Sequence, residues 1–120
     1  MKSWEPMSPV VLSVRVLERD ICVRAIFLDE GMSVLLAGGD KTHIGAVSIK
    51  EPGRSVVTVC LEGHREDCIS ERWAVALGEA IDQTVCVQCG IHYDYLSRSG
   101  IEQVLEACNQ LLEKIMNILK

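Results

Sequence analysis

The sequence is poor in aromatic residues, in proline and in positive charge. Its 120 residues include two Trp, two Tyr, one Phe and three Pro, and 12 Lys and Arg stand against 17 Asp and Glu, for a formal net charge of −5. Such a chain lacks the basic surface on which affinity for nucleic-acid phosphates depends, so no nucleic acid is expected as a partner. A hydrophobic share of 48% excludes a disordered chain, and the length suits one domain.

Long apolar runs are also missing. Trp4-Glu5-Pro6 interrupts the N-terminal segment, and the run Val10–Leu17 is broken by Ser13 and Arg15. Neither segment has the length of a secretory signal core or a membrane span, so we expect a cytoplasmic protein with no membrane partner. Cysteines in that compartment stay reduced.

Cysteine, by contrast, is frequent, with six residues. Most of them lie in apolar-patterned segments, where cysteine usually serves as a small buried hydrophobe: Cys22, Cys60, Cys86, Cys89 and Cys108. Cys86 and Cys89 have the CxxC spacing of redox and zinc motifs, but an alternating strand pattern turns them to opposite faces. We therefore interpret the cysteines as core residues.

The first half of the chain has the pattern of consecutive strands. The predicted strands are Val10–Leu17, Ile21–Leu28, Met32–Ala37, Ile44–Lys50 and Ser55–Leu61. Asp29-Glu30-Gly31 and Glu51-Pro52-Gly53-Arg54 have the composition of turns, and residues 38–42 are expected to form a loop.

In the second half of the chain the spacing of apolar residues changes from that of strands to that of helices. Helical spacing predicts a helix from about Asp67 to Asp82 with Asp67 as N-cap, and Thr84–His92 returns to strand alternation. Ser97 then caps a strongly amphipathic final helix, with Leu96 and Ile101 placed as a hydrophobic staple. The predicted fold class is α+β, an antiparallel β-sheet meander with two helices on one face. Because the apolar stripe of the last helix reaches almost to its end and neither sheet edge has an obvious cover, we expect a homodimer.

Polar residues and glycines concentrate first between two strands. Gly38 and Gly39 allow backbone amides to form an anion-binding nest, Gly45 permits close approach of a ligand, and Lys41 and His43 supply donors. Glycines between strands more often serve only the turn. This motif indicates a binding site only in combination with others.

Two further polar segments follow. Residues 64–72 lead into the first helix, whose N-terminus favours a phosphate that Arg72 would assist and that Asp67 and Glu71 would oppose; a solvated capping segment is the alternative. Gly90-Ile91-His92 ends the last strand, where His92 either reaches a ligand or lies on the surface.

Each of the three segments contains one histidine: His43, His64 and His92. Three imidazoles with an open fourth position are typical of catalytic zinc. No pair has HxH or i,i+4 spacing and no nucleophile elbow is present, so a metal-dependent enzyme is the less favoured alternative.

Read in chain order, these residues resemble a known family. The matching stretches are Gly38-Gly39, His43-Ile44-Gly45, Val47, His64, Ile69-Ser70-Glu71-Arg72 and Gly90-Ile91-His92. This set is similar to the prenylated-flavin chaperone family, which includes the LpdD-like D subunit of gallate decarboxylase and accompanies UbiD-type decarboxylases. The resemblance implies one domain over residues 20–120, preceded by an extension or first strand over residues 1–19. Ala46 departs from the family, which has an aspartate there.

The resemblance also implies a fold and a function. The fold would be dimeric, α+β and similar to that of the proteasome assembly chaperones. The protein would bind reduced prenylated FMN and deliver it to an apo-decarboxylase, carrying the cofactor without catalysis. The implied cofactor-binding residues are Gly38, Gly39, Lys41, His43, Gly45, His64, Ser70, Glu71, Arg72, Gly90 and His92, with no metal ligand among them. The phosphate is assigned to Gly38-Gly39 or to the helix start at residues 70–72. A protein-only assembly factor or decarboxylase subunit is a third hypothesis.

Overall fold

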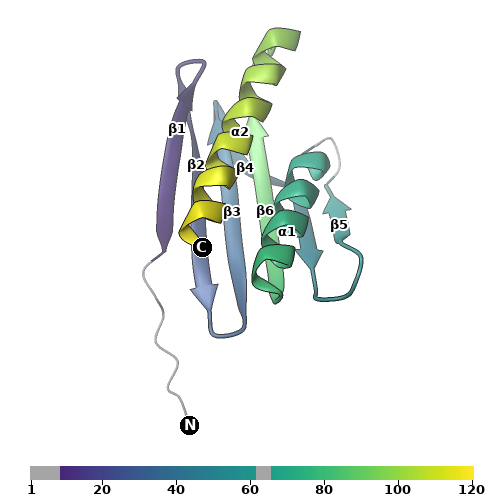
Figure 1. Cartoon of the computed structure of the whole chain (residues 1–120). Helices are drawn as coiled ribbons and strands as arrows, with labels where there is room; N and C mark the ends of the chain where they lie inside the picture. The colour runs from purple at the N-terminus through teal and green to yellow at the C-terminus, as the bar shows by residue number, and fades with distance from the viewer. Residues whose placement is uncertain (1–8, 62–65) are drawn as a thin grey trace.

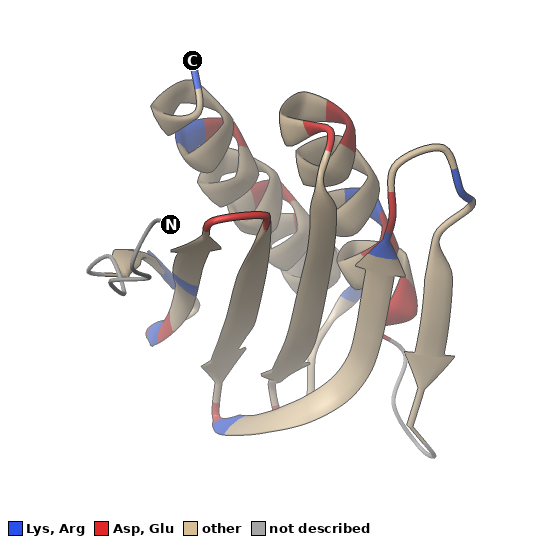
Figure 2. Ribbon diagram, turned by 90° about the horizontal axis from the view of Figure 1, so that it is seen from below, with Lys and Arg blue, Asp and Glu red and all other residues tan. Residues whose placement is uncertain are grey.

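The computed structural model describes residues 9–61 and 66–120. The elements are β1 (Val10–Val16), β2 (Arg19–Leu28), β3 (Gly31–Gly39), β4 (Lys41–Lys50), β5 (Val57–Cys60), α1 (Asp67–Ile81), β6 (Thr84–His92) and α2 (Arg98–Ile118). Both helices lie on the same face of a single sheet (Figures 1 and 2), which confirms the predicted α+β class. Within these described residues, neither helix is long and apolar enough to cross a membrane.

The sheet is mixed at its centre. Its strand order is β1-β2-β3-β6-β4-β5, and β6 is parallel to β3 but antiparallel to β4. The predicted meander is therefore wrong at this point, although the other pairs are antiparallel. After β5 the chain leaves the sheet, forms α1 on one face and returns as β6 between β3 and β4, as Figure 1 shows.

The corner between β3 and β4 receives the end of β6. The loop predicted over residues 38–42 is wrong, because only Asp40 separates the two strands. His92 pairs with Gly39 on one side and with Lys41 on the other, and its carbonyl accepts a hydrogen bond of 2.6 Å from the Asp40 amide. A Cβ atom at Gly39, which has φ +86°, would overlap that carbonyl. At this corner the backbones of β3 and β6 approach so closely that position 39 has no room for a side chain.

A bulge in β4 lies beside this corner. Thr42 pairs with Ile91 and Ala46 with Cys89, so residues 43–45 of β4 lie opposite the single residue Gly90. A Cβ atom at Gly90 would overlap the carbonyl oxygen of His43. The bulge therefore places His43 and Gly45 outside the regular strand alternation, and the missing side chain of Gly90 permits it.

The core lies between the sheet and the two helices. Its largest fully buried side chains include Trp73 and Leu77 of α1, Leu111 and Ile115 of α2, and Ile21 and Leu36 of the sheet. The predicted cap of α2 is confirmed, since Ser97 Oγ accepts a 3.0 Å hydrogen bond from the Gly100 amide. The predicted N-cap of α1 is wrong: Glu66 holds that position, and its side chain makes no capping hydrogen bond.

Only two of the five cysteines interpreted as core residues belong to the core, and Cys22 and Cys86 are half-buried on the other face of the sheet. Cys89 and Cys108 are buried, and burial raises the pKa of both thiols, that of Cys108 to about 12. Cys86 is half-buried on the face opposite Cys89, which confirms the prediction for the CxxC pair. Cys60, predicted as a core residue, is exposed at the end of the short edge strand β5. All six lie in the described ranges, and no disulfide joins any two of them.

Candidate functional site

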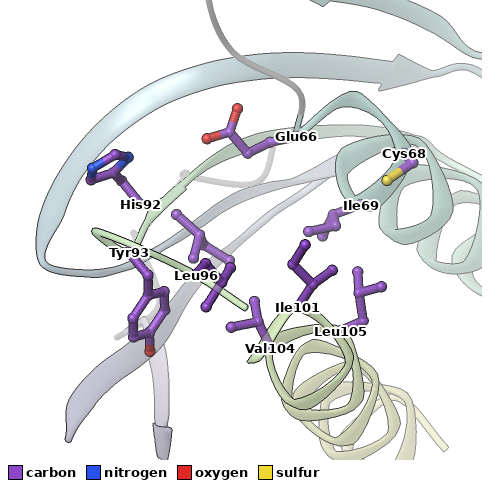
Figure 3. A pocket seen from close by; sticks show the side chains of 10 residues that line it. Glu66, Cys68, Ile69, His92, Tyr93, Leu96, Ile101, Val104 and Leu105 are labelled. Carbon is purple, nitrogen blue, oxygen red and sulfur yellow. The ribbon is translucent and has the colours of Figure 1, made fainter. Parts of the chain in front are cut away.

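A cavity of about 420 Å³ lies where α1 begins, α2 begins and β6 ends. Figure 3 shows ten side chains around it: Glu66, Cys68, Ile69, Ile91, His92, Tyr93, Leu96, Ile101, Val104 and Leu105. Ligand pockets of roughly 300–1,000 Å³ with mostly apolar walls and a few directed polar groups are typical of small-molecule and cofactor sites. The cavity has the size and composition of such a site.

Its apolar wall comes from the stripe of α2. Ile101 and Leu105 lie on the same stripe as the buried Val104 and Cys108, yet they are 47% and 40% exposed. Over this first part of α2 the stripe therefore faces the cavity rather than a packed neighbour. Leu96, the expected staple partner of Ile101, lines the same cavity. Aliphatic side chains exposed in a concave surface mark a place where a ligand can bury them.

The polar end of the cavity is formed by Glu66 and His92. Glu66 is only 8% exposed, and its Oε1 lies 2.8 Å from Nε2 of His43 in the β4 bulge. His92 Nε2 lies 2.9 Å from Asp94 Oδ1, and the His43 and His92 rings meet edge to face with centroids 6.4 Å apart. The structure thus brings together two of the three predicted histidines. His64, the third, lies outside the described residues.

Gly45 explains the position of the Glu66 side chain. A Cβ atom at Gly45 would overlap the carboxylate of Glu66, so this carboxylate occupies the space that a larger residue would fill. Held over β4 beside His43, it cannot cap α1. Gly45 and Gly90, two of the predicted site residues, therefore shape the polar end of the cavity, although neither lines it.

The Gly38-Gly39 segment does not form the expected nest. Gly38 pairs with Ile21 and Ile91 inside the sheet, and the Asp40 amide already donates to His92. The carboxylate of Asp40 accepts hydrogen bonds of 2.8 Å from the Asp94 amide and from Arg19 Nε. These two donors, the amide first, hold the pKa of Asp40 below its usual value. The Asp40 carboxylate therefore occupies the position at which a phosphate was expected. Lys41, the next residue, is exposed.

Ser70 serves the packing of α1 on the sheet. Its buried hydroxyl donates to the Asp67 carbonyl over 3.1 Å and lies 2.7 Å from Ser48 Oγ. Ser48 Oγ lies 2.7 Å from Thr58 Oγ1 in turn. This chain of hydroxyls ties α1 to β4 and β5, and Ser70 does not line the cavity.

Arg72 lies on another side of α1. Its Nε donates a 2.8 Å hydrogen bond to Asn109 Oδ1 of α2. It lines a second cavity of about 270 Å³, which shares Cys68, Ile69 and Leu105 with the first. Arg72 therefore lies one cavity away from the histidines, along the groove between the helices. Glu71 lines neither of these two cavities and contributes to a further one beside Arg72.

Metal-ligand geometry is not found in the described part of the chain. No group of three or more His, Cys, Asp or Glu residues there is placed to hold a metal ion.

Comparison with known families identifies the chain. Residues 16–120 match the family described as the prenylated flavin chaperone LpdD-like domain. The chain belongs to this family. The match extends the predicted domain of residues 20–120 slightly toward the N-terminus, and β1 pairs with β2 in the same sheet.

Among solved structures, the fold is similar to that of a chain in a crystal structure of a chaperone complex for yeast 20S proteasome assembly. The TM-score is 0.59 at 15% sequence identity, over 95% of this chain and 100% of that chain. At this identity the likeness concerns the fold, and it confirms the similarity predicted from the sequence. A search of curated protein sequences finds no significant match.

Sequence reasoning missed Glu66 as a site residue. Glu66 and Ile69 are three residues apart and both line the cavity, whereas the predicted binding residues of this segment do not: Ser70, Glu71 and Arg72. The signal that could have found Glu66 is the pairing of an acid at a helix start with a glycine next to a strand histidine. The acid at the helix start supplies a carboxylate, and the glycine leaves the space in which that carboxylate lies.

Proposed function

We propose that this protein binds reduced prenylated FMN in the cavity between α1 and α2 and delivers it to an apo-decarboxylase of the UbiD type. The observation that carries the proposal is the exposed aliphatic wall of Ile101 and Leu105, closed at one end by Glu66 and His92. A prenylated isoalloxazine offers a matching surface, because its fused rings are largely apolar and its hydrogen-bonding groups lie at one edge. Family membership supports the choice of this flavin over others.

The distribution of charge supports one placement of the phosphate. Of the two positions expected from the sequence, the Gly38-Gly39 corner contains the carboxylate of Asp40. Arg72 offers a guanidinium in the groove that continues from the cavity past Cys68 and Ile69. A ligand with its ring in the first cavity and its phosphate toward Arg72 would follow this groove.

Carriage rather than catalysis agrees with the character of the site. The cavity opens to the surface beside the exposed Cys68, and a carrier must release its cargo. Its directed groups are one paired carboxylate and one imidazole at the rim. We place the protein in the cytoplasm, where the six cysteines would remain thiols.

Anaerobic titration with reduced prenylated FMN tests this proposal. We expect saturable binding that His43→Ala and Arg72→Ala each weaken by ~10-fold, because one change releases Glu66 and the other removes the cation. Lys114→Ala is the control, since Lys114 is an exposed cation on α2 that lines neither cavity and lies away from the open face of the sheet. The loaded protein should also restore activity to the apo-decarboxylase.

Two results would count against the proposal. Unchanged affinity in both variants would remove the site assignment. A stable complex with the decarboxylase in which neither partner retains flavin would favour the protein-only assembly factor instead.

We also propose that the protein is a homodimer formed through the face of the sheet that carries no helix (Figure 2). Across β4 and β5, Val47 pairs with Val59 and Ile49 pairs with Val57. Ile49, Val57 and Val59 are exposed. A second copy would cover this apolar patch. Light scattering should give twice the chain mass, and Val59→Glu should reduce it to that of one chain. A single-chain mass of the unmodified protein over a wide concentration range would contradict the dimer.

A further inference from the structure

Helix α2 orders the two neighbouring cavities along its axis. Ile101 lines only the first cavity, Leu105 lines both, and Asn109 lines only the second, where it accepts the hydrogen bond from Arg72. Residues four positions apart lie on one side of a helix, and at about 1.5 Å per residue Ile101 and Asn109 are separated by about 12 Å along α2. The first cavity therefore has a near part toward Arg72 and a far part at Ile101.

The far part of the cavity is aliphatic. Leu96, Ile101 and Val104 line the first cavity and not the second, and Figure 3 shows their side chains around the start of α2. Ile101 is 47% exposed, so a ligand in the cavity can reach its side chain. Among the ten lining residues only Tyr93 has a phenyl ring; it is buried, and its hydroxyl donates to the Val16 carbonyl over 2.8 Å. The far part thus offers branched aliphatic side chains rather than an exposed phenyl ring on which a flat aromatic system could stack.

The structure of a prenylated flavin relates its added ring to its phosphate. The prenyl group closes a fourth, non-aromatic ring between N5 and C6 of the isoalloxazine, and this ring carries two methyl groups. The ribityl phosphate leaves from N10, on the opposite side of the central ring from N5. In the placement proposed above, the phosphate points along the groove toward Arg72. The fourth ring then points the other way, into the far part of the cavity.

We propose that Ile101 and Leu96 pack against the prenyl-derived ring and make the protein prefer prenylated FMN to FMN. This inference rests on the proposed function. The five added carbons bury apolar surface that FMN leaves unfilled, and the gain in affinity grows with that area. Leu105 differs, because it lines both cavities and so lies beside the portion that the two flavins share. Ile101 is then a specificity-determining residue, whereas Leu105 contributes to the binding of either flavin.

The test compares two ligands in anaerobic titrations. Reduced prenylated FMN and reduced FMN are each titrated into the unmodified protein, Ile101→Ala and Leu105→Ala. For the unmodified protein we expect prenylated FMN to bind ~100-fold more tightly than FMN. Ile101→Ala should bind prenylated FMN ~10-fold more weakly and FMN as before, so the ratio of the two affinities falls. Leu105→Ala should weaken both ligands alike and leave the ratio unchanged.

The ratio of affinities separates recognition of the added ring from a general effect on the fold, which would act on both ligands. Ile101→Val removes one methyl group, so it should lower the ratio by ~3-fold and decides the result if the alanine variant does not fold. An unchanged ratio in the Ile101 variants, or an equal fall in Leu105→Ala, would overturn the inference while leaving flavin binding intact. Failure of the unmodified protein to bind reduced prenylated FMN would overturn the proposed function, and this inference with it.

Discussion

Gly90→Ala is expected to destabilise the protein by about 3 kcal/mol, because the new methyl group has no space in the folded backbone. It would overlap the carbonyl oxygen of His43, a backbone atom in the neighbouring strand that cannot rotate away. Relief requires β4 and β6 to separate at the bulge, in the centre of the sheet. For a chain of this length the loss should lower the melting temperature by about 10 °C.

Gly53→Ala provides the matched comparison. A Cβ atom at Gly53 meets nothing within 4 Å, but the residue has φ +71° in the turn between β4 and β5. The free energy of unfolding of this variant should therefore fall only by the cost of placing alanine in a left-handed conformation, about 1–2 kcal/mol. Thermal unfolding followed by circular dichroism measures both. Equal losses in the two variants would show that the close approach of β4 to Gly90 is not a stability requirement.

Gly45→Ala is expected to weaken flavin binding by ~10–100-fold while leaving the fold almost unchanged. Here the added methyl group overlaps the carboxylate of Glu66, which is the end of a flexible side chain. The carboxylate can swing away without movement of the backbone, but it then loses His43 and its place in the cavity. Because the displaced carboxylate can turn toward solvent instead of remaining buried without a partner, the melting temperature should fall by only a few degrees.

Gly78→Ala is the control for the effect of Gly45→Ala on flavin binding. Its methyl group would likewise meet a flexible charged side chain, that of Lys50, but at the far end of α1 from the cavity. Anaerobic titration should give the affinity of the unmodified protein for Gly78→Ala and a reduced one for Gly45→Ala. If both bind alike, the position of the Glu66 carboxylate does not matter for the ligand.

The elements of the fold were readable from the sequence because their signals are local. Period-two alternation marked the strands, period 3.6 marked the two helices, and Ser97 marked the start of α2. The place of β6 was not readable in this way. A strand that pairs with partners 35 to 53 residues away leaves no trace in its own pattern. Its insertion between β3 and β4 depends on contacts at the Gly39–His92 corner.

The candidate site was only partly predictable for the same reason. The motifs marked His43, Gly45, Gly90 and His92, which the β4 bulge and the end of β6 bring together. They also marked Ser70 and Arg72, which the turn of α1 directs to the sheet and to α2. Helical geometry separates residues that are neighbours in the sequence, so the motif alone could not show that Glu66 reaches the cavity.

The central position of β6 also has a consequence for how the chain acquires its fold. Strands β1–β3 can pair with one another as soon as they are synthesised, and β4 with β5, but the two groups stay separate until residues 84–92 arrive. Until then β3 and β4 each present an open edge to solvent. The rate-limiting step of folding should therefore be the entry of β6, and a nascent chain that stops before Thr84 would be prone to aggregation through those two edges.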